Sequence, residues 1–377
     1  MVSSQSLMPF THDDLEWMSR AIGLARRGEG AVEPNPMVGC VLVKDGRIVA
    51  EGYHRRFGSD HAEVDAMKSI RDAQLLRGAT AYVTLEPCCH TGKTPPCTDA
   101  LLVAGISRVV IAMRDPFPKV DGGGIEQLRI GGIEVALGCL HHEALTLNAP
   151  YIKRLHQRRP WVIAKWAMSI DGRIATMTGD SQWITGPVAR ADVHQVRGRV
   201  DAIIIGGRTM VADNPTLTAR PPGQRIATRI VLAGKRLPSP QSNLVATADQ
   251  GPVWVIVSPG HDDRDRAKLV DAGIRILEPV ISGRAETAAW LLDELGALSM
   301  TNVVVEGGGE TIASFSSIDQ IDEIHAYVGA KLIGGTSAPG PVGGAGLMRM
   351  VDSPEFRCID VRRFDNDVRM TFRRQSR

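Results

Sequence analysis

Aromatic side chains, cysteine and an excess of charge of either sign are all scarce in this chain of 377 residues. Lys plus Arg number 44 against 42 for Asp plus Glu, which leaves a net charge of +2. A chain so close to neutral has no strong field to draw it to nucleic acid or to an anionic membrane. We therefore expect it to act on small molecules.

Long apolar runs are also absent, since the sequence has no stretch of the ~18 apolar residues that cross a bilayer. Runs such as 109–113 and 202–205 have the length of buried strands instead. Residues 1–10 lack the basic stretch followed by an apolar run that marks a secretory signal. These absences predict a cytoplasmic protein that contacts no membrane.

Six cysteines are too few for a disulfide scaffold in a chain of this size. Cys40, Cys139 and Cys358 stand among Val, Leu or Ile and are expected to be inert core thiols. The other three crowd into the segment 88–97. In a reducing compartment, such a cluster suggests metal binding.

The length suits two domains, and 43% apolar and 23% charged residues are close to globular averages. The first domain opens with a capping-box pattern, Thr11 with Asp14, before apolar residues at helical spacing. An Asp-Gly step at 45–46 predicts a hairpin turn. Strand-like runs that alternate with short helices predict a sheet with helices on both faces, an α/β/α arrangement. These runs are 38–43, 48–53, 79–85, 108–113 and 133–137.

The pattern breaks in a basic segment, 148–160, which we interpret as a linker between domains 1–147 and 161–377. A second series of strands and helices follows. The stretch 334–346 is dense in Gly and Pro and predicts a mobile loop. The strand candidates of the second domain are 161–168, 202–205, 229–232, 253–257, 302–305 and 324–328.

A possible metal site lies in the first domain, where His61 and Glu63 stand at the start of a predicted helix. Cys88 follows a strand, and Cys97 leads into another helix, whose positive end favours a thiolate. One imidazole and two thiolates suit zinc, and three ligands leave a fourth position for water. Zinc lowers the pKa of bound water to about 7. Glu63 is then the candidate for moving protons in a hydrolytic deamination.

This arrangement matches the zinc deaminase signature with one departure. Residues 89–96 separate the two cysteines, whereas the common signature has an interval of about two. The alternative is a closed structural site, with Cys89 or His90 as the fourth ligand. That alternative leaves Glu63 without a role and requires adjacent Cys88 and Cys89 to reach one ion together.

Several motifs occur together and in order along the chain. They are PNPMVGC at 34–40, HAE at 61–63, EPCCHTGKTPPC at 86–97, KWAMSIDGRIA at 165–175, SQWITG at 181–186, the stretch 206–220 and EGGGET at 306–311. Together they closely resemble the bifunctional riboflavin-biosynthesis deaminase–reductase family over nearly the whole chain. The long interval between the cysteines is the usual form in that family.

The resemblance implies a cytidine-deaminase-like α/β/α sandwich followed by a dihydrofolate-reductase-like α/β domain. It also implies two reactions on a pyrimidine nucleotide. Zinc would serve the hydrolytic deamination of a diaminohydroxyphosphoribosylaminopyrimidine, and NADPH the reduction of its ribosyl chain to ribityl. By position in the family, His61, Cys88 and Cys97 bind one zinc ion per chain, Glu63 carries protons and Asn35 lies near the substrate. A homodimer or higher homo-oligomer is also expected.

In the second domain, a strand ends at Glu306 and three glycines precede a predicted helix, an arrangement that lets backbone N–H groups approach a phosphate. The segment does not match the Rossmann pattern G-x-G-x-x-G, and a tight turn that needs glycine is the alternative. By position in the family, the substrate contacts are Ser181, Arg197, Leu217, Arg220 and Glu306. The cofactor contacts are Met168, Trp183, Thr209, Asp213, Gly234, Gly308, Gly309, Glu310 and Thr311.

Two of these assignments have a chemical basis of their own. The guanidinium groups of Arg197 and Arg220 suit a substrate that carries a phosphate, because each can donate two hydrogen bonds to it. Met168 stands where the family has alanine, and Gly234 has no side chain. Contacts at these two positions would therefore be made by the backbone.

Two other classes of function remain open. A zinc deaminase acting on another nucleotide or on a nucleic-acid base shares the chemistry but predicts a basic, aromatic-bearing groove. A net charge of +2 and 5% aromatic residues argue against such a groove. A zinc-braced binding protein without turnover is the second class, and it predicts that Glu63→Gln leaves function intact.

Overall fold

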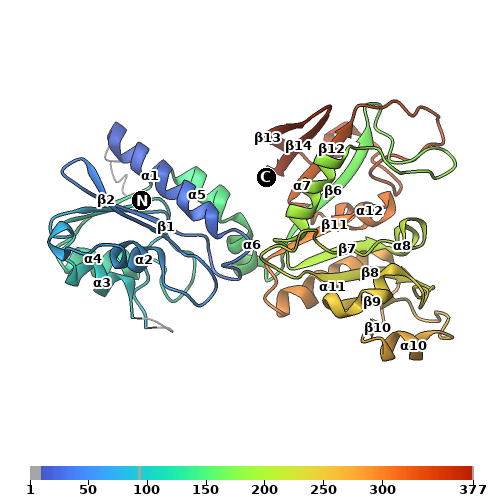
Figure 1. Cartoon of the computed structure of the whole chain (residues 1–377), viewed down its shortest axis with the longest axis horizontal. Helices are drawn as coiled ribbons and strands as arrows, with labels where there is room; N and C mark the ends of the chain where they lie inside the picture. The colour runs from blue at the N-terminus through green and yellow to red at the C-terminus, as the bar shows by residue number, and fades with distance from the viewer. Residues whose placement is uncertain (1–9, 92–94, 376–377) are drawn as a thin grey trace. The chain divides into compact units, whose positions relative to one another are not determined.

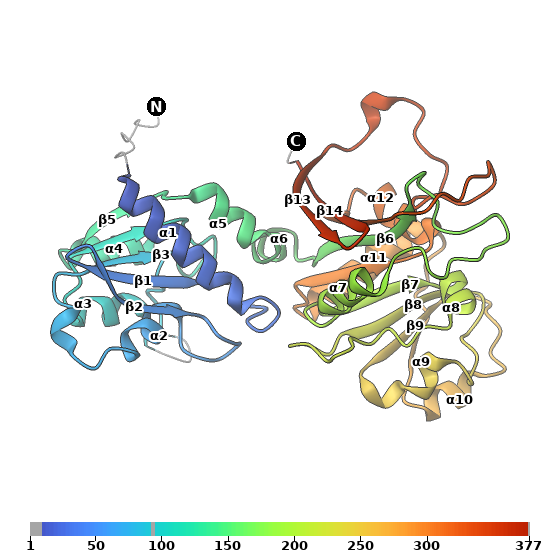
Figure 2. The ribbon, with the colours of Figure 1, turned by 45° about the horizontal axis from the view of Figure 1, so that its top comes forward.

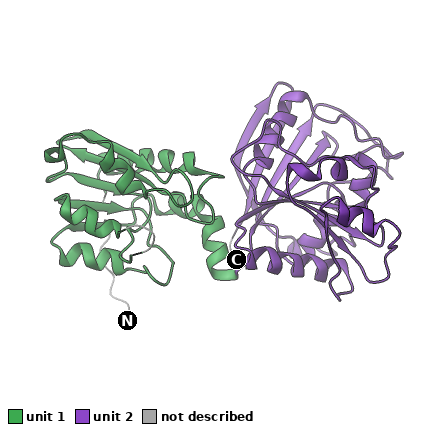
Figure 3. Cartoon of the chain, turned by 60° about the horizontal axis from the view of Figure 1, so that its bottom comes forward, with its two compact units in different colours: residues 1–157 green, residues 158–377 purple. Residues whose placement is uncertain are grey.

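A computed structural model of the chain describes residues 10–91 and 95–375. The chain divides into two compact units, Met1–Gln157 and Arg158–Arg377 (Figure 3). Residues 1–9, considered above for a signal, and 92–94, part of the cysteine motif, lie outside the described residues. No helix within the described ranges is long and apolar enough to cross a membrane.

Unit 1 alternates strands with helices along most of its length (Figure 1). Its strands are β1 (Gly39–Lys44), β2 (Arg47–Tyr53), β3 (Thr80–Val83), β4 (Arg108–Ile111) and β5 (Glu134–Leu137). Its α-helices are α1 (His12–Ala25), α2 (Ala62–Lys68), α3 (Cys97–Val103), α4 (Gly123–Ile130), α5 (His141–Leu147) and α6 (Ala149–Gln157). The five strands form one sheet in the order β2-β1-β3-β4-β5.

Helices cover both faces of this sheet, as the cartoon shows for α1 on one side (Figure 2). Met18 of α1 packs in a buried cluster with Val41 of β1, while Leu128 of α4 belongs to a second cluster with Leu42. Adjacent strand residues fall in different clusters because successive side chains point to opposite faces of a sheet. The predicted α/β/α sandwich is confirmed.

Local sequence signals account for the first elements of unit 1. The Thr11 side chain accepts a hydrogen bond from the backbone N–H of Asp14, and the Asp14 side chain accepts one from the backbone of Thr11, which completes the capping box of α1. Asp45 and Gly46 have φ of 50° and 69°, as the turn between β1 and β2 requires. These two predictions are confirmed.

Unit 2 has a larger sheet. Its strands are β6 (Trp161–Ser169), β7 (Ala202–Gly206), β8 (Thr228–Gly234), β9 (Val253–Val257), β10 (Arg275–Leu277), β11 (Asn302–Glu306), β12 (Glu323–Gly329), β13 (Phe356–Phe364) and β14 (Asp367–Arg374). Its α-helices are α7 (Pro187–Arg197), α8 (Gly207–Asp213), α9 (Asn243–Ala246), α10 (Arg266–Asp271), α11 (Arg284–Ala297) and α12 (Gly309–Ser317).

The nine strands of unit 2 run in the order β10-β9-β8-β7-β11-β6-β12-β14-β13. All neighbouring pairs are parallel except those that involve β14. Leu291 of α11 and Phe315 of α12 pack with Val303 on one face, and Ala189 of α7 packs with Tyr327 in a separate cluster. Parallel strands put their carboxyl ends at one edge, and the side chains that follow β7 and β11 therefore lie near each other.

The structure differs from the sequence-based expectations in several places. Most of the expected linker, 148–160, is helix α6, which belongs to unit 1. The hairpin of β13 and β14 was not predicted, because its edge strand has no clean alternation of apolar residues. Residues 334–346 contain no helix or strand. Cys40 and Cys139 are buried as expected, but the prediction for Cys358 was wrong, since it faces solvent on the edge strand β13.

Candidate metal centre and cofactor cradle

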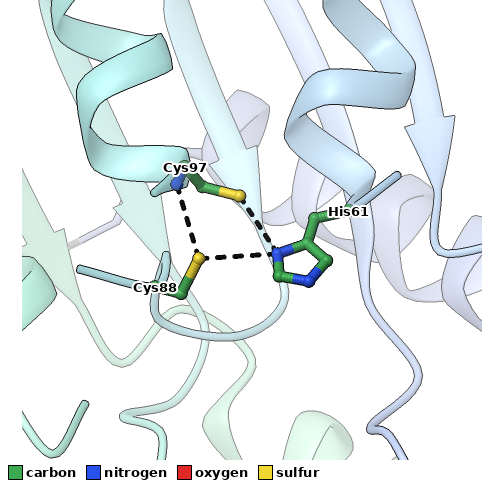
Figure 4. Close-up of side chains that lie close together, drawn as sticks. All are labelled: His61, Cys88 and Cys97. Carbon is green, nitrogen blue, oxygen red and sulfur yellow. Dashed lines mark hydrogen bonds between the residues drawn. The ribbon is translucent and has the colours of Figure 1, made fainter. Parts of the chain in front are cut away.

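Three segments of unit 1 bring His61, Cys88 and Cys97 together (Figure 4). His61 is the N-cap residue of α2, and Cys97 is the first residue of α3. Cys88 lies in the loop after β3, and its sulfur accepts a hydrogen bond of 3.4 Å from the backbone N–H of Cys97. The two helix starts therefore face the end of one strand, as the positions of these residues in the sequence had indicated.

The distances within this cluster fit a zinc ion. The three ligand atoms, His61 Nδ1 and the two Sγ atoms, all lie within 4.8 Å of one another. Nδ1 lies 3.2 Å from Sγ of Cys97 and 3.5 Å from Sγ of Cys88. Ligand bonds of about 2.1 and 2.3 Å in a tetrahedron give an N–S separation of roughly 3.5 Å. The donor set and its spacing are therefore those of a three-ligand zinc site.

The pKa values of the three side chains shift in different directions. Contact with the Cys97 thiol, helped by His61, lowers the pKa of Cys88 to about 4 although burial opposes it. The Cys88 sulfur and burial both raise the pKa of Cys97 above its ordinary value. The hydrogen bond with Cys88 raises the pKa of His61 to about 8. A metal must displace the protons of Cys97 and His61, so its affinity falls as pH falls.

Glu63 lies beside this cluster in the first turn of α2. It is 3% exposed, and burial raises the pKa of its carboxyl group. The charge of His61 and the nearby Cys97 side chain act in the opposite direction and lower this pKa. A buried carboxyl group with a raised pKa is suited to general acid–base catalysis.

Cys89 and His90, the alternative fourth ligands, point elsewhere. The Cys89 thiol contacts the carbonyl oxygen of Lys119 at 3.8 Å, and the His90 ring packs against Phe117 with centroids 6.0 Å apart. Among the described residues, the candidate metal cluster contains only His61, Cys88 and Cys97. The geometry therefore argues against the closed site.

Asn35 is connected to the cluster through His54. The Asn35 amide nitrogen lies 3.3 Å from His54 Nε2, and the rings of His54 and His61 are 5.7 Å apart in an edge-to-face arrangement. His54 Nδ1 lies 2.9 Å from the carbonyl oxygen of Asp60, so this nitrogen donates and Nε2 accepts from Asn35. Burial lowers the pKa of His54, in agreement with a neutral ring.

In unit 2, the glycine segment after β11 forms a cradle. Gly307 and Gly308 have φ of 68° and 75°, which favours glycine at both positions. A Cβ on Gly308 would lie 2.8 Å from Oγ1 of Thr209, and one on Gly206 would lie 2.3 Å from Oγ1 of Thr311. The predicted cofactor residues Thr209, Gly308 and Thr311 are thus close together at the start of α12. Backbone donors, two hydroxyl groups and a helix N-terminus fit the phosphates of a dinucleotide.

A buried charged cluster lies at the end of β11. Glu306 accepts two hydrogen bonds from Arg197, at 2.7 and 2.8 Å, and Lys165 Nζ is 3.8 Å from Glu306. Although burial opposes it, the charges of Arg197 and Lys165 lower the pKa of Glu306 to about 2. Burial lowers the pKa of Lys165. The two predicted substrate residues Arg197 and Glu306 therefore pair with each other.

Three predicted substrate residues of unit 2, Ser181, Leu217 and Arg220, lie in the loops before α7 and after α8. The Ser181 hydroxyl is 3.5 Å from the Asp213 carboxylate, at the end of α8. The loop after α8 contains Leu217, which is 2% exposed and has a φ of 56°. The exposed Arg220 donates to Oγ1 of Thr216 at 3.3 Å.

Trp183 lies at the edge of a cavity of about 410 Å³. Its ring is 58% exposed and lies under the Arg190 guanidinium, 4.4 Å from the ring centroid. Met168 and Gly234 are near the ends of β6 and β8. Gly309 begins α12, and Glu310 accepts a hydrogen bond from the backbone of Gly344.

Sequence reasoning missed two of the residues at these sites. His54 gave no signal, because nothing in its surroundings distinguishes it from a surface histidine. Lys165 could have been found from the sequence, since a lysine in the middle of the apolar run 161–168 has to be paired or functional.

Family models match both units. Residues 11–113 match the cytidine and deoxycytidylate deaminase zinc-binding region, and residues 160–370 match the RibD C-terminal domain. The chain is 39% identical to the riboflavin biosynthesis protein RibD of Actinobacillus pleuropneumoniae, with 96% of each chain covered. It is 41% identical to the protein of the same name from Bacillus amyloliquefaciens, over 94% of this chain and 95% of the relative.

Solved structures are similar over the same length. A Thermotoga maritima protein described as a diaminohydroxyphosphoribosylaminopyrimidine deaminase/5-amino-6-(5-phosphoribosylamino)uracil reductase is 36% identical, with a TM-score of 0.82. The alignment covers 97% of this chain and 99% of that chain. Acinetobacter baumannii RibD is 35% identical with a TM-score of 0.80, at 97% and 99% coverage.

Proposed function

Because this chain belongs to the RibD family of riboflavin biosynthesis proteins, we infer that its two units catalyse successive steps on one pyrimidine nucleotide. The chain is a bifunctional enzyme, a zinc deaminase joined to an NADPH-dependent reductase. The first substrate is a diaminohydroxyphosphoribosylaminopyrimidine, and the deaminated product is the substrate of the reductase.

We assign the deamination to residues 1–147, extended by α6. His61, Cys88 and Cys97 would hold the metal, and bound zinc supplies a water molecule of lowered pKa as the nucleophile. Glu63 takes a proton from the attacking water, and passes protons to the ring nitrogen and to the leaving amino group. Asn35 and His54 border the same site and are placed to bind the pyrimidine.

One observation carries this assignment: the three ligand atoms lie within 4.8 Å of one another, and a buried carboxyl group with a raised pKa is beside them. A zinc ion that only braced the fold would need neither Glu63 nor an open position. The arrangement supports a catalytic metal site over a structural one.

We assign the reduction to unit 2, with NADPH as the hydride donor. The cradle of Gly308, Thr209 and Thr311 is placed to bind cofactor phosphate groups. Reduction of the ribosyl chain also needs a proton, which the buried Lys165–Glu306 pair is placed to hold. Both carboxylate oxygens of Glu306 accept from Arg197, and the exposed Arg220 is therefore the better candidate for the substrate phosphate.

The remaining assignments keep the roles expected from the family. Ser181 and Leu217 are proposed to contact the substrate, and the proposed cofactor contacts are Met168, Trp183, Asp213, Gly234, Gly309 and Glu310. We also propose a cytoplasmic location and a homodimer or higher homo-oligomer.

The order of the two reactions tests the proposal. Purified protein is incubated with the diaminopyrimidinone nucleotide, with and without NADPH, while ammonia and the absorbance of the reduced cofactor are followed. Ammonia is expected without NADPH, and cofactor oxidation only after deamination. Cofactor consumption without ammonia would show that the role of unit 1 is wrong.

A further inference from the structure

Two loops of unit 1 flank the metal-ligand cluster. The first, residues 33–37, contains Asn35, which contacts His54 beside His61. The second, residues 114–122, packs against the segment after Cys88 through two contacts. These join Phe117 to the His90 ring, and the Lys119 carbonyl oxygen to the Cys89 thiol. Both loops thus contact residues next to the metal ligands.

Two side chains of the α5–α6 segment bind the first loop. Asn148, which is 1% exposed, accepts a hydrogen bond from the backbone N–H of Met37 at 2.9 Å and donates one to its carbonyl oxygen at 3.0 Å. Arg154 donates to the carbonyl oxygen of Pro34 at 3.3 Å. The backbone on both sides of Asn35 is therefore fixed by this segment.

The second loop is bound by Tyr151 of α6. Its hydroxyl group donates to Oδ1 of Asp115 at 3.0 Å, and the tyrosine is 7% exposed. The same Oδ1 accepts from the backbone N–H of Phe117 at 3.0 Å. Glu86 accepts from the backbone N–H groups of Asp115 and Gly122, at 3.2 and 3.0 Å. This loop is held on one side by the strand end that leads to Cys88 and on the other by α6.

We infer that Asn148, Tyr151 and Arg154 are positioning residues for the deaminase, and that they set the separation of the two loops around the bound pyrimidine. This inference rests on the proposed function of unit 1. The three side chains are spaced at 148, 151 and 154, so they share one side of the helical segment. Their hydrogen bonds go to the loops and not to the metal ligands. Substrate affinity should depend on them, and metal content should not.

The test is the variant Tyr151→Phe in the full chain, assayed for ammonia release, zinc content and reduction of supplied deaminated substrate. The KM for the pyrimidine is expected to rise about fivefold, which is the change in affinity expected when one buried hydrogen bond is lost. The kcat per bound zinc is expected to change less than about twofold, since the ligands and Glu63 are untouched. Zinc content and the reductase rate should equal those of the wild type.

Tyr82→Phe is the matched control. Like Tyr151, Tyr82 donates a buried hydrogen bond to an aspartate, in this case Asp14 at 2.9 Å. Asp14 pairs with Arg108 at the start of β4, whereas the partner of Tyr151, Asp115, follows the end of that strand. The control variant should keep the wild-type KM. Arg154→Ala should raise the KM. Arg154→Lys should raise it less, because lysine retains a hydrogen-bond donor.

The outcomes distinguish a failure of the proposed function from a failure of the positioning role. Wild-type protein that releases no ammonia contradicts the proposed function and removes the basis of the inference. With an active wild type, an unchanged KM in Tyr151→Phe overturns the inference. Loss of zinc, or an equal rise of KM in Tyr82→Phe, also overturns it, because the tyrosine would then have only a general structural role.

Discussion

At the scale of single residues, the chemistry of unit 1 depends on how burial changes proton affinity. Cys88 has a pKa of about 4 because it contacts the Cys97 thiol and the His61 ring, while burial raises the pKa of Glu63. One site therefore contains a thiol that loses its proton readily and a carboxyl group that holds its proton more tightly than usual. Metal binding requires the thiolate, and proton transfer requires a carboxyl group with a raised pKa.

Glu63→Gln should separate these two needs. The amide cannot carry a proton, so ammonia release is expected to fall by at least about 100-fold. Zinc should stay near one ion per chain, since the metal cluster does not include Glu63. Ammonia assay and metal analysis of the same sample test this, with Glu143→Gln on the exposed side of α5 as the control. Full ammonia release by Glu63→Gln would contradict the role of Glu63 as the proton carrier.

At the scale of elements, the metal cluster depends on how closely α2 lies against the sheet. Gly52 of β2 lies directly against α2, because a Cβ there would lie 2.3 Å from the backbone nitrogen of Ala66 and 2.5 Å from the carbonyl oxygen of Ala62. Since His61 and Glu63 stand at the start of the same helix, any displacement of α2 moves the proposed ligand and the proposed proton carrier together.

Gly52→Ala is therefore expected to destabilise unit 1 and to weaken metal binding. The overpacking should cost about 1–3 kcal/mol of unfolding free energy. Urea unfolding and zinc content measure the two effects. Gly23→Ala is the control, since a Cβ at Gly23 in α1 meets nothing within 4 Å, and this change should stabilise the helix by up to about 1 kcal/mol. A variant Gly52→Ala with wild-type stability and zinc content would contradict the argument.

At the scale of the whole molecule, the two sets of functional residues belong to different compact units. The metal ligands lie in unit 1 and the glycine cradle in unit 2, and the two units have separate buried clusters. Neither set of residues needs the other for its local geometry. The two reactions should therefore respond independently to changes at one site.

Metal removal tests this independence. Treatment with a chelator should abolish ammonia release, while NADPH oxidation with supplied deaminated substrate should continue at the rate of the untreated enzyme. Restoring zinc should recover ammonia release. A parallel loss of the reductase rate on chelation would show that the metal of unit 1 also supports unit 2.

The local features of both units could be predicted from the residues that form them. The capping box at Thr11, the turn at 45–46 and the run 253–257 form the predicted elements, because each depends on neighbouring residues. The clustering of His61, Cys88 and Cys97 was predictable as well, since few residue types bind zinc and these three follow the end of a strand or begin a helix. For the cofactor cradle, the run of three glycines after a strand was a comparable signal.

Contacts between side chains far apart in the chain could not be predicted in this way. Arg197 and Glu306 are 109 residues apart, and they pair because the last residue of α7 and the last residue of β11 meet in the folded unit. The expected linker became a helix of unit 1 because Asn148 and Tyr151 find buried partners there. Contacts of this kind depend on the three-dimensional arrangement of whole elements, which no local pattern of residue types records.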